Sequence, residues 1–402
     1  NLRAIIDYRK SLSLNANNVS CIHNYAKALG REGEWQSAFK QVERAIKIRP
    51  GDTDIIVTKG FIEYKLDQFE AADHTFKEII KSHPQHYEAM YFRGFTNLKQ
   101  KNFEIGWELF DHRWNSPSFL SKRYNFETAE WNGSSSGEKL LIWDEQGPGD
   151  QIMCSLFFNK PLNNFDEIFI LCDPRLQGIF SRSFDKNITF LPNDYDIKKV
   201  KYDEHLSMFG LLKYYAKQDR DPKKNEVTLK FDDNEVNRIK GKLNSERKIC
   251  GISWFSKNNQ SGKDRSYGLL NFIKSFGNSM HDYVYVNLQY NSSVEEINQV
   301  SRKLGVTIYN DEAIDLFNDI DGLLNLAGAC DFIVSIDNTT IHIAGAAGIN
   351  TYVLLTRPWD WRWLDGINIW YPRTRCYPQE KTVNRDNFLK NTIREISQTI
   401  QK

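Results

Sequence analysis

The sequence predicts helical repeats followed by two α/β domains, each built around a parallel sheet. Three observations support this prediction. A 34-residue period runs through the first quarter of the 402-residue chain, turn-forming residues then crowd 115–137, and short apolar runs alternate with amphipathic segments from there onward. The expected parts are repeats over 1–114, a linker over 115–137, α/β domains over 138–246 and 247–386, and a closing helix over 387–402.

The 34-residue period appears in four sets of positions. They are Ala26, Gly60 and Gly94; Ala38, Ala72 and Gly106; Val42, Phe76 and Phe110; and Pro50 with Pro84. Small residues let paired helices approach closely, larger apolar residues fill the space between neighbouring units, and proline ends a helix. The pattern resembles the tetratricopeptide repeat, and its phase predicts that residue 1 lies inside the second helix of a repeat. An accidental period in an ordinary helical bundle is the alternative interpretation.

Composition excludes several classes of protein. Lys and Arg number 53 against 52 Asp and Glu, so the chain lacks the overall positive charge that nucleic-acid and anionic-membrane binders usually show. The six cysteines show no CxxC pair and no metal-ligand spacing, which argues against a disulfide framework or a zinc site. The most apolar stretch, Ile341–Leu355, is shorter than the roughly 20 residues of a membrane-spanning helix. We therefore expect a cytoplasmic protein without a resident metal.

Nine short apolar runs are predicted to be strands. They are Lys139–Trp143, Glu167–Cys172, Ile188–Leu191, Val227–Phe231, Ile249–Ser253, Tyr283–Leu288, Thr307–Tyr309, Phe332–Ser335 and Thr351–Leu355. Strands separated by helical segments form βαβ units with parallel pairing. Because this region is too long for one such sheet, we place a boundary near Asn244–Arg247. Two Rossmann-like domains would then present their strand ends to a shared ligand site.

The first chemical motif, WDEQGPGDQI at Trp143–Ile152, predicts a strand, a glycine turn and the start of a helix. Two glycines allow the backbone to approach a ligand closely, and Asp150 places a carboxylate at the head of the helix. That carboxylate could accept a proton, or it could simply cap the helix. The expected site loop consists of Gln146, Gly147 and Gly149.

A dinucleotide fingerprint is a competing interpretation of the same loop. Gly147 and Gly149 match the first two glycines of GxGxxG, and Asp173 could hold a ribose. Ile152, however, stands where the third glycine should be, and a carboxylate at Asp150 would repel a pyrophosphate. The motif therefore favours acid–base chemistry over dinucleotide binding.

The second motif, SIDNTTIHIAGAAG at Ser335–Gly348, again predicts a strand, a polar turn and a helix. The hydroxyls of Thr339 and Thr340, with the N–H groups of the helix start, would form a seat for a diphosphate, which the helix dipole favours. Asp337 could hold sugar hydroxyls. Simple capping by the threonines and a core position for His342 are the alternatives.

The third motif, GISWFSK at Gly251–Lys257, leads into a polar loop that contains Arg265. Ser253 at a strand end, Lys257 as a mobile cation and Arg265 as a bidentate donor could together bind a leaving diphosphate. The plain alternative is a solvated surface loop.

An aromatic loop at Arg357–Trp363, with WYP at Trp370–Pro372 beyond it, follows the last predicted strand. Indole rings at the edge of a ligand site stack on bases and sugars and exclude water, which makes Trp361 a candidate for the site. Interdomain packing would use the same rings equally well.

The motifs, in their order along the chain, resemble the glycosyltransferase family nine type of enzyme. The segments that carry the resemblance are WDEQGPGDQI, GISWFSKNN with DRS, VNLQ, VSIDNTTIHIAGAAG, PWDWRWLDG and WYP. That group includes the ADP-heptose lipopolysaccharide heptosyltransferases, and the similarity is strongest to its bacterial branch fused to tetratricopeptide repeats. The resemblance implies a GT-B fold of two Rossmann-like domains, a nucleotide-sugar donor bound mainly by the C-terminal domain, inversion at the anomeric carbon, and neither a cofactor nor an essential metal.

The resemblance also assigns roles to residues. Asp150 matches the general base, Ser253 and Lys257 match positions that contact the donor phosphates, and Asp337 matches the acidic residue near the donor sugar. The helix start expected beside the diphosphate holds Asn338, Thr339, Thr340 and His342. Pro148 and Asn338 depart from the residues usual at their positions.

We therefore expect an inverting, metal-independent hexosyl- or heptosyltransferase that moves a sugar from a nucleotide-sugar donor to an acceptor hydroxyl. Repeats beside a transferase favour a protein or peptide acceptor. A surface glycan acceptor is one alternative, and a non-catalytic repeat scaffold with a degenerate transferase fold is another. No nucleic-acid partner and no membrane span are expected.

Overall fold

The structure is a computed structural model that describes residues 2–216, 221–257 and 262–401. Contacts between residues divide the chain into two compact units. The repeat unit comprises Asn1–Leu120, Asn258–Asp264 and Pro358–Asp365, and the α/β unit comprises Ser121–Lys257, Arg265–Arg357 and Gly366–Lys402. Two short described segments of the predicted range 247–386, at 262–264 and 358–365, therefore belong, by their contacts, to the repeat unit.

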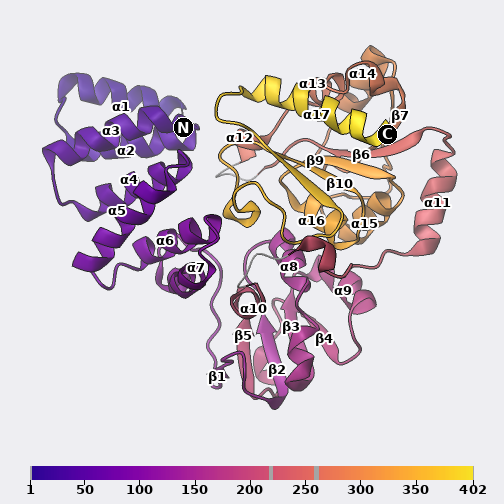
Figure 1. Ribbon diagram of the computed structural model, residues 1–402, viewed down its shortest axis with the longest axis horizontal. Helices are drawn as coiled ribbons and strands as arrows, with labels where there is room; N and C mark the ends of the chain where they lie inside the picture. Colours follow the sequence, from indigo (N-terminus) through magenta and orange to yellow (C-terminus); the bar gives the residue numbers. More distant parts are fainter. Residues whose placement is uncertain (1, 217–220, 258–261, 402) are drawn as a thin grey trace. The chain divides into compact units, whose positions relative to one another are not determined.

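The repeat unit consists of helix pairs joined by short turns (Figure 1). Its helices are α1 (Leu2–Leu14), α2 (Val19–Arg31), α3 (Trp35–Ile48), α4 (Thr53–Lys65), α5 (Phe69–Ser82), α6 (Tyr87–Lys99) and α7 (Phe103–Phe110). α2 packs against α3, α4 against α5, and α6 against α7. The predicted tetratricopeptide-type repeats are confirmed.

Small residues allow the paired helices to lie close together. A Cβ at Gly94 would lie 2.7 Å from the backbone nitrogen of Phe110, and one at Gly60 would lie 2.7 Å from Cε1 of Phe76. Phe76 also contacts Phe92 of the next pair, with 5.9 Å between ring centroids. The column of large apolar residues therefore fills the space both within a pair and between pairs.

Polar caps at the helix starts follow the same period. The side chains of Asn18, Asp52 and His86 each accept a hydrogen bond from the backbone N–H three residues later, at 3.0, 3.3 and 3.2 Å. These residues precede α2, α4 and α6 and satisfy N–H groups that have no partner inside the helix. The repeat thus includes the helix starts as well as the packed faces.

The aromatic loop at Pro358–Asp365 packs within the repeat unit. The rings of Trp361 and Trp107 lie 5.8 Å apart between centroids. The buried ammonium of Lys99 donates to the carbonyl of Trp359 at 2.7 Å and lies 4.9 Å from the centroid of the Trp359 ring. The structure therefore favours the packing interpretation for Trp361 over its predicted place at the edge of a ligand site.

The first sheet of the α/β unit is entirely parallel. Its strands are β1 (Ala129–Glu130), β2 (Gly137–Trp143), β3 (Phe165–Cys172), β4 (Ile188–Pro192) and β5 (Glu204–Ser207), with helices α8 (Pro148–Ser155), α9 (Gln177–Ser183) and α10 (Met208–Tyr215). In the order β1-β5-β2-β3-β4, strands are added on one side of β2 up to β4 and then on the other side. The loop after β2 lies at this switch point, where such sheets bind ligands.

The second sheet is also parallel and has the order β11-β10-β9-β6-β7-β8. Its strands are β6 (Lys248–Ser253), β7 (Tyr283–Asn287), β8 (Thr307–Tyr309), β9 (Phe332–Ile336), β10 (Thr351–Leu355) and β11 (Thr374–Pro378). This is the strand order of a Rossmann fold, with its switch point between β6 and β9. The two sheets and the repeats confirm the predicted fold class.

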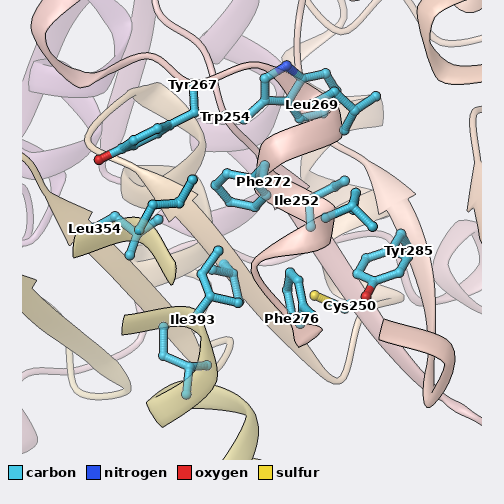
Figure 2. Close-up of a cluster of buried hydrophobic side chains, with 14 of the residues drawn as sticks. Cys250, Ile252, Trp254, Tyr267, Leu269, Phe272, Phe276, Tyr285, Leu354 and Ile393 are labelled. Atoms are coloured by element: carbon cyan, nitrogen blue, oxygen red, sulfur yellow. The ribbon is translucent and has the colours of Figure 1, made fainter. Parts of the chain in front are cut away.

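Helices connect and cover the strands of the second sheet (Figure 1). They are α11 (Asp233–Leu243), α13 (Leu269–Lys274), α14 (Val294–Leu304), α15 (Ile320–Gly328), α16 (Thr339–Ala346) and α17 (Arg385–Gln401), while α12 (Gly262–Arg265) falls between β6 and α13 in the sequence. Figure 2 shows the core beneath them, where Ile252 of β6 and Leu354 of β10 lie with Phe272 of α13 and Ile393 of α17. Burial of such apolar side chains holds α17 on the sheet.

One predicted strand is wrong, and the sequence misses three others. Val227–Phe231 forms no strand, because the N–H groups of Thr228 and Leu229 donate to the carbonyl of Ala346 at 2.9 and 3.0 Å instead of joining a ladder. Leu229 of this segment is buried, whereas Val227 is half exposed. The unpredicted strands β1, β5 and β11 are short and carry polar residues, so their sequences lack a strand pattern.

Candidate functional site

Asp150 lies at the start of α8, in the loop that follows β2. Its Oδ2 accepts a hydrogen bond from the N–H of Gly147, the N-cap residue, at 3.4 Å. This bond is long, and the Asp150 side chain is only partly buried. The carboxylate therefore contributes to the helix cap, as the alternative interpretation predicts, and still has access to its surroundings.

The turn before Asp150 is held in an unusual conformation. Gln146 has a φ of 65°, in the left-handed region that non-glycine residues seldom adopt, and its N–H donates to Oγ of Ser121 at 3.1 Å. A Cβ at Gly147 would meet no heavy atom within 4 Å. The predicted loop residues Gln146 and Gly147 thus form a fixed turn with an open side next to the carboxylate.

Gly149 brings this loop against the second Rossmann-like domain. A Cβ at this position would lie 3.1 Å from Cδ2 of His342 and 3.4 Å from Oγ1 of Thr339. Both residues belong to α16, which packs against α8 (Figure 1). The first turns of the two helices therefore meet, with Gly149, the residue before Asp150, against Thr339 and His342.

Asn338 braces the strand ends at the second switch point. Its Oδ1 accepts from the N–H of Thr340 at 3.1 Å and caps α16, while its Nδ2 donates to Oγ of Ser253 at 2.7 Å. Ser253 is fully buried and donates to Oε1 of Gln289 at 3.0 Å. Thr340 is buried too, and its hydroxyl donates to the carbonyl of Leu288 at 3.4 Å. These three side chains thus hold neighbouring strand ends and loops together, and their contact with a donor stays a prediction.

Gln289 holds the loop that leads from β6 to Lys257. Its Oε1 also accepts from the N–H groups of Trp254 and Phe255, at 2.9 and 2.7 Å. Lys257 itself is exposed, and its backbone N–H donates to Oη of Tyr290 at 3.0 Å. Sequence reasoning missed Gln289 as a residue of the site, although the VNLQ segment that contains it supports the family resemblance.

Arg265 and Asp337 form an ion pair, with 2.9 Å between Nη1 and Oδ2. A second guanidinium nitrogen, Nη2, lies 3.4 Å from Oγ of Ser256. The side chain of Asp337 is 8% exposed and that of Arg265 is 17% exposed. The predicted ligands of the diphosphate and of the sugar therefore bind each other in this structure.

His342 is buried beside Tyr371, with 2.8 Å between its Nδ1 and the phenol oxygen. Burial raises the pKa of Tyr371 well above its ordinary value, and electrostatic interactions with Cys154 and Asp150 raise it further. The phenol is therefore protonated near neutral pH. Sequence reasoning did not assign Tyr371 a role, and the WYP motif is the signal that could have found it.

A second carboxyl, Asp144, lies where β2 ends. Oη of Tyr124 is 2.8 Å from Oδ1 of Asp144 and also 2.8 Å from the carbonyl oxygen of Asn193. Nδ2 of Asn193 donates to the other carboxylate oxygen of Asp144, Oδ2, at 3.3 Å. Burial raises the pKa of Asp144, and the hydrogen bonds from Tyr124 and Asn193 oppose that rise. The sequence alone did not identify Asp144 as a residue of the site, because its hydrogen-bond partners are distant along the chain.

The ranges 2–216, 221–257 and 262–401 contain no group of three or more His, Cys, Asp or Glu side chains arranged to hold a metal ion. Over the same part of the chain, no helix is long and apolar enough to cross a bilayer.

The fold and the site define a protein in which two Rossmann-like domains follow tetratricopeptide-type repeats in the sequence. No family model matches the chain. Protein FlbA of Caulobacter vibrioides is 26% identical over 365 residues, which cover 84% of this chain and 60% of FlbA. The chain thus spans 60% of the length of this curated relative.

Two of the similar solved structures each match one part of the chain. The glycosyl transferase family 9 structure from Veillonella parvula DSM 2008 has a TM-score of 0.47 and 10% identity, over 66% of this chain and 97% of that chain. MamA from Desulfovibrio magneticus RS-1 has a TM-score of 0.25 and 19% identity, over 27% of this chain and 61% of that chain. Each is a similarity of arrangement at low sequence identity.

Proposed function

We propose that the chain is an inverting glycosyltransferase that moves a sugar from a nucleotide-sugar donor to an acceptor hydroxyl. The observation that carries this proposal is the meeting of α8 and α16 at their first turns, beside the partly exposed carboxylate of Asp150. Both helices follow strands at the switch points of their sheets. A base thus lies near a helix N-terminus that favours anions, as displacement of an anionic leaving group requires.

In the proposed reaction, Asp150 acts as the general base. Its carboxylate takes the proton of the acceptor hydroxyl while that oxygen forms a bond to the anomeric carbon of the sugar. The bond from this carbon to the nucleoside diphosphate breaks, and its electron pair leaves with the diphosphate. A single displacement inverts the anomeric carbon, and the proton transfer contributes about 10²- to 10⁴-fold in rate.

Groups of the second domain would stabilise the negative charge that develops on the leaving diphosphate. The first turn of α16 supplies the positive end of a helix dipole and the partly exposed hydroxyl of Thr339, and Lys257 supplies an exposed cation. These groups provide the positive charge that a metal ion would otherwise supply, which supports a metal-independent reaction. Because Asp337 already matches the charge of Arg265, we assign this pair to holding the sugar side of the site.

We propose a protein or peptide as the acceptor, because stacked helix pairs present surfaces suited to protein recognition. A surface glycan is the alternative acceptor. We also propose a cytoplasmic location, which the six cysteines support: all six lie in the described ranges and are free thiols, as is usual in a reducing compartment.

One observation favours a second candidate function, a non-catalytic repeat scaffold. Asp150 contributes to a helix cap, and Arg265 is paired with Asp337. Groups that catalysis would use therefore have structural roles as well, as they would in a protein that retained only the fold.

A panel of donors tests the proposed function. Protein is mixed with hexoses linked to UDP, GDP, ADP or CMP, and with ADP-heptose, in the presence of peptide or glycan acceptors, and released nucleotide is measured. We expect one nucleotide class to raise the apparent melting temperature and its sugar to be transferred. Replacing Lys257 with Ala should weaken binding of that nucleoside diphosphate about tenfold, whereas Lys303→Ala, at an exposed lysine of α14, should not. Peptide binding without turnover of any donor would favour the scaffold.

A further inference from the structure

The ring of Tyr371 occupies a place that α16 is shaped to receive. A Cβ at Gly345 would lie 2.5 Å from both Cγ and Cδ2 of Tyr371, so only glycine leaves room for the ring. His342 precedes Gly345 by one helical turn, on the same face of α16. The phenol therefore lies across the helix face with its hydroxyl at the imidazole.

The backbone around Tyr371 is fixed by one buried amide. Oδ1 of Asn368 accepts from the N–H groups of Trp370 and Tyr371 at 3.0 and 3.1 Å. Its Nδ2 donates to the carbonyls of Tyr371 and Thr374 at 2.7 and 2.8 Å. Four hydrogen bonds from a single side chain thus hold the position from which the phenol reaches His342.

The chemistry of the phenol favours one direction for the hydrogen bond between the two rings. Tyr371 is buried and, because its pKa is raised, its hydroxyl carries a proton that needs an acceptor. Within the described ranges, the hydrogen-bond partner of this hydroxyl is Nδ1 of His342, at 2.8 Å. When Nδ1 accepts, a neutral imidazole carries its own proton on Nε2.

The other edge of the imidazole faces the reaction loop. Cδ2 of His342, the carbon bonded to Nε2, lies 3.1 Å from a Cβ built at Gly149. Position 149 directly precedes Asp150. We propose that Tyr371 is a positioning residue, which keeps the proton of His342 on Nε2 so that this N–H donates to the leaving diphosphate. This proposal rests on the proposed glycosyl transfer. It adds Tyr371 as the residue that determines the tautomer of His342.

Nitrogen NMR of protein labelled with ¹⁵N-histidine tests the proposal directly. The chain contains eight histidines. The resonances that disappear in His342→Gln are therefore assigned to His342. We expect the Nε2–H tautomer in the native protein, a mixture of tautomers in Tyr371→Phe, and a shift of the Nε2 resonance when pyrophosphate, UDP, GDP or ADP is added. An Nδ1–H tautomer in the native protein would overturn the proposal, even if Tyr371→Phe fails to fold, and so would an unchanged tautomer in a folded Tyr371→Phe.

Kinetics provide the second readout. Tyr371→Phe should lower kcat about 10- to 100-fold, the size of effect usual for residues that orient a functional histidine. The matched control is Tyr377→Phe, since the buried hydroxyl of Tyr377 has no hydrogen-bond partner in the described part of the chain; it should leave both kcat and the His342 tautomer unchanged. Equal loss of kcat in both variants would contradict the positioning role. Lack of transfer by the native protein would count against the proposed function, whereas the tautomer test stands without activity.

Discussion

The guanidinium of Arg265 lies 2.9 Å from the carboxylate of Asp337, and both side chains are largely buried. A buried carboxylate needs a charged or hydrogen-bonding partner, and the loop after β6 supplies one in Arg265. The pair connects that loop to the end of β9, across the switch point of the second sheet. Two side chains that the sequence suggests as separate ligands therefore act together.

Loss of Arg265 should destabilise the fold. Arg265→Met would leave the carboxylate of Asp337 buried without its partner, which lowers the free energy of unfolding by about 3–5 kcal/mol. Arg375→Met is the control, because its pair with Glu395 is much more exposed and should contribute far less to stability. Urea unfolding of the two variants measures the difference. A similar decrease in the free energy of unfolding for both variants would show that the buried Arg265–Asp337 pair contributes no more than an exposed pair.

Gly149→Ala should impair transfer more than stability. The added Cβ would press on His342 and Thr339 and shift the meeting point of α8 and α16 by a few tenths of an ångström. Misplacement of reacting groups on the scale of 1 Å lowers rates up to about 100-fold, so we expect kcat to fall at least severalfold. Gly147→Ala, which adds a methyl group into open space, should retain kcat. Steady-state kinetics measure kcat for both variants. An equal kcat for Gly149→Ala and Gly147→Ala would contradict the close approach of α8 to α16.

Gly94→Ala should loosen the last helix pair of the repeats. Its Cβ would lie 2.7 Å from the backbone of Phe110, and such overpacking costs about 1–3 kcal/mol. Gly241→Ala in α11 makes the same substitution where no heavy atom lies within 4 Å. There the higher helix propensity of alanine should raise stability by up to about 1 kcal/mol. Thermal unfolding should therefore show shifts of opposite sign, and two shifts of the same sign would refute the packing explanation.

His205 should make the protein less stable in acid. Burial, followed by the charge of Arg123, lowers the pKa of His205 to about 4, from an ordinary value of 6.5. Between these pH values the unfolded chain binds a proton that the folded chain does not. Stability is therefore complete above pH 6.5 and declines as the pH falls toward 4, by up to about 3 kcal/mol.

His205→Phe removes this titration and keeps a ring to stack on Phe126, whose centroid lies 3.6 Å from that of the imidazole. Urea unfolding at several pH values between 7 and 4 should give a flatter pH dependence for the variant than for the native protein. Parallel curves would mean that other groups cause the acid sensitivity.

The sequence predicts the fold well where structure depends on local pattern. Small and large residues 34 apart predict helix pairs because each repeat makes the same contact, as Gly60 and Gly94 show. Apolar runs predict the central strands of both sheets. The strand predicted at Val227–Phe231 does not form, because an apolar extended segment can pack without pairing to another strand. Its hydrogen bonds go to Ala346, which is more than 100 residues away in the sequence.

The site is only partly predictable, because partners far apart in sequence decide what each side chain does. Asp150 and Thr339 are found from strand–turn–helix patterns, and the structure places both at the meeting helices. Ser253 is buried with Gln289 as its hydrogen-bond partner, and Asp337 is buried with Arg265 as its ion-pair partner. No local pattern reveals these pairs, nor the contact between Tyr371 and His342.

The most direct test compares the transfer rates of Asp150→Asn and Asp144→Asn, with nucleoside diphosphate binding measured on both. Asparagine preserves shape at position 150 but cannot act as a base, so we predict a loss of about 10²-fold or more in transfer with unchanged nucleotide binding. Asp144 instead accepts hydrogen bonds from Tyr124 and Asn193, so its replacement should leave the rate near that of the native protein. Normal transfer by Asp150→Asn, in a preparation whose native protein is active, would contradict the account.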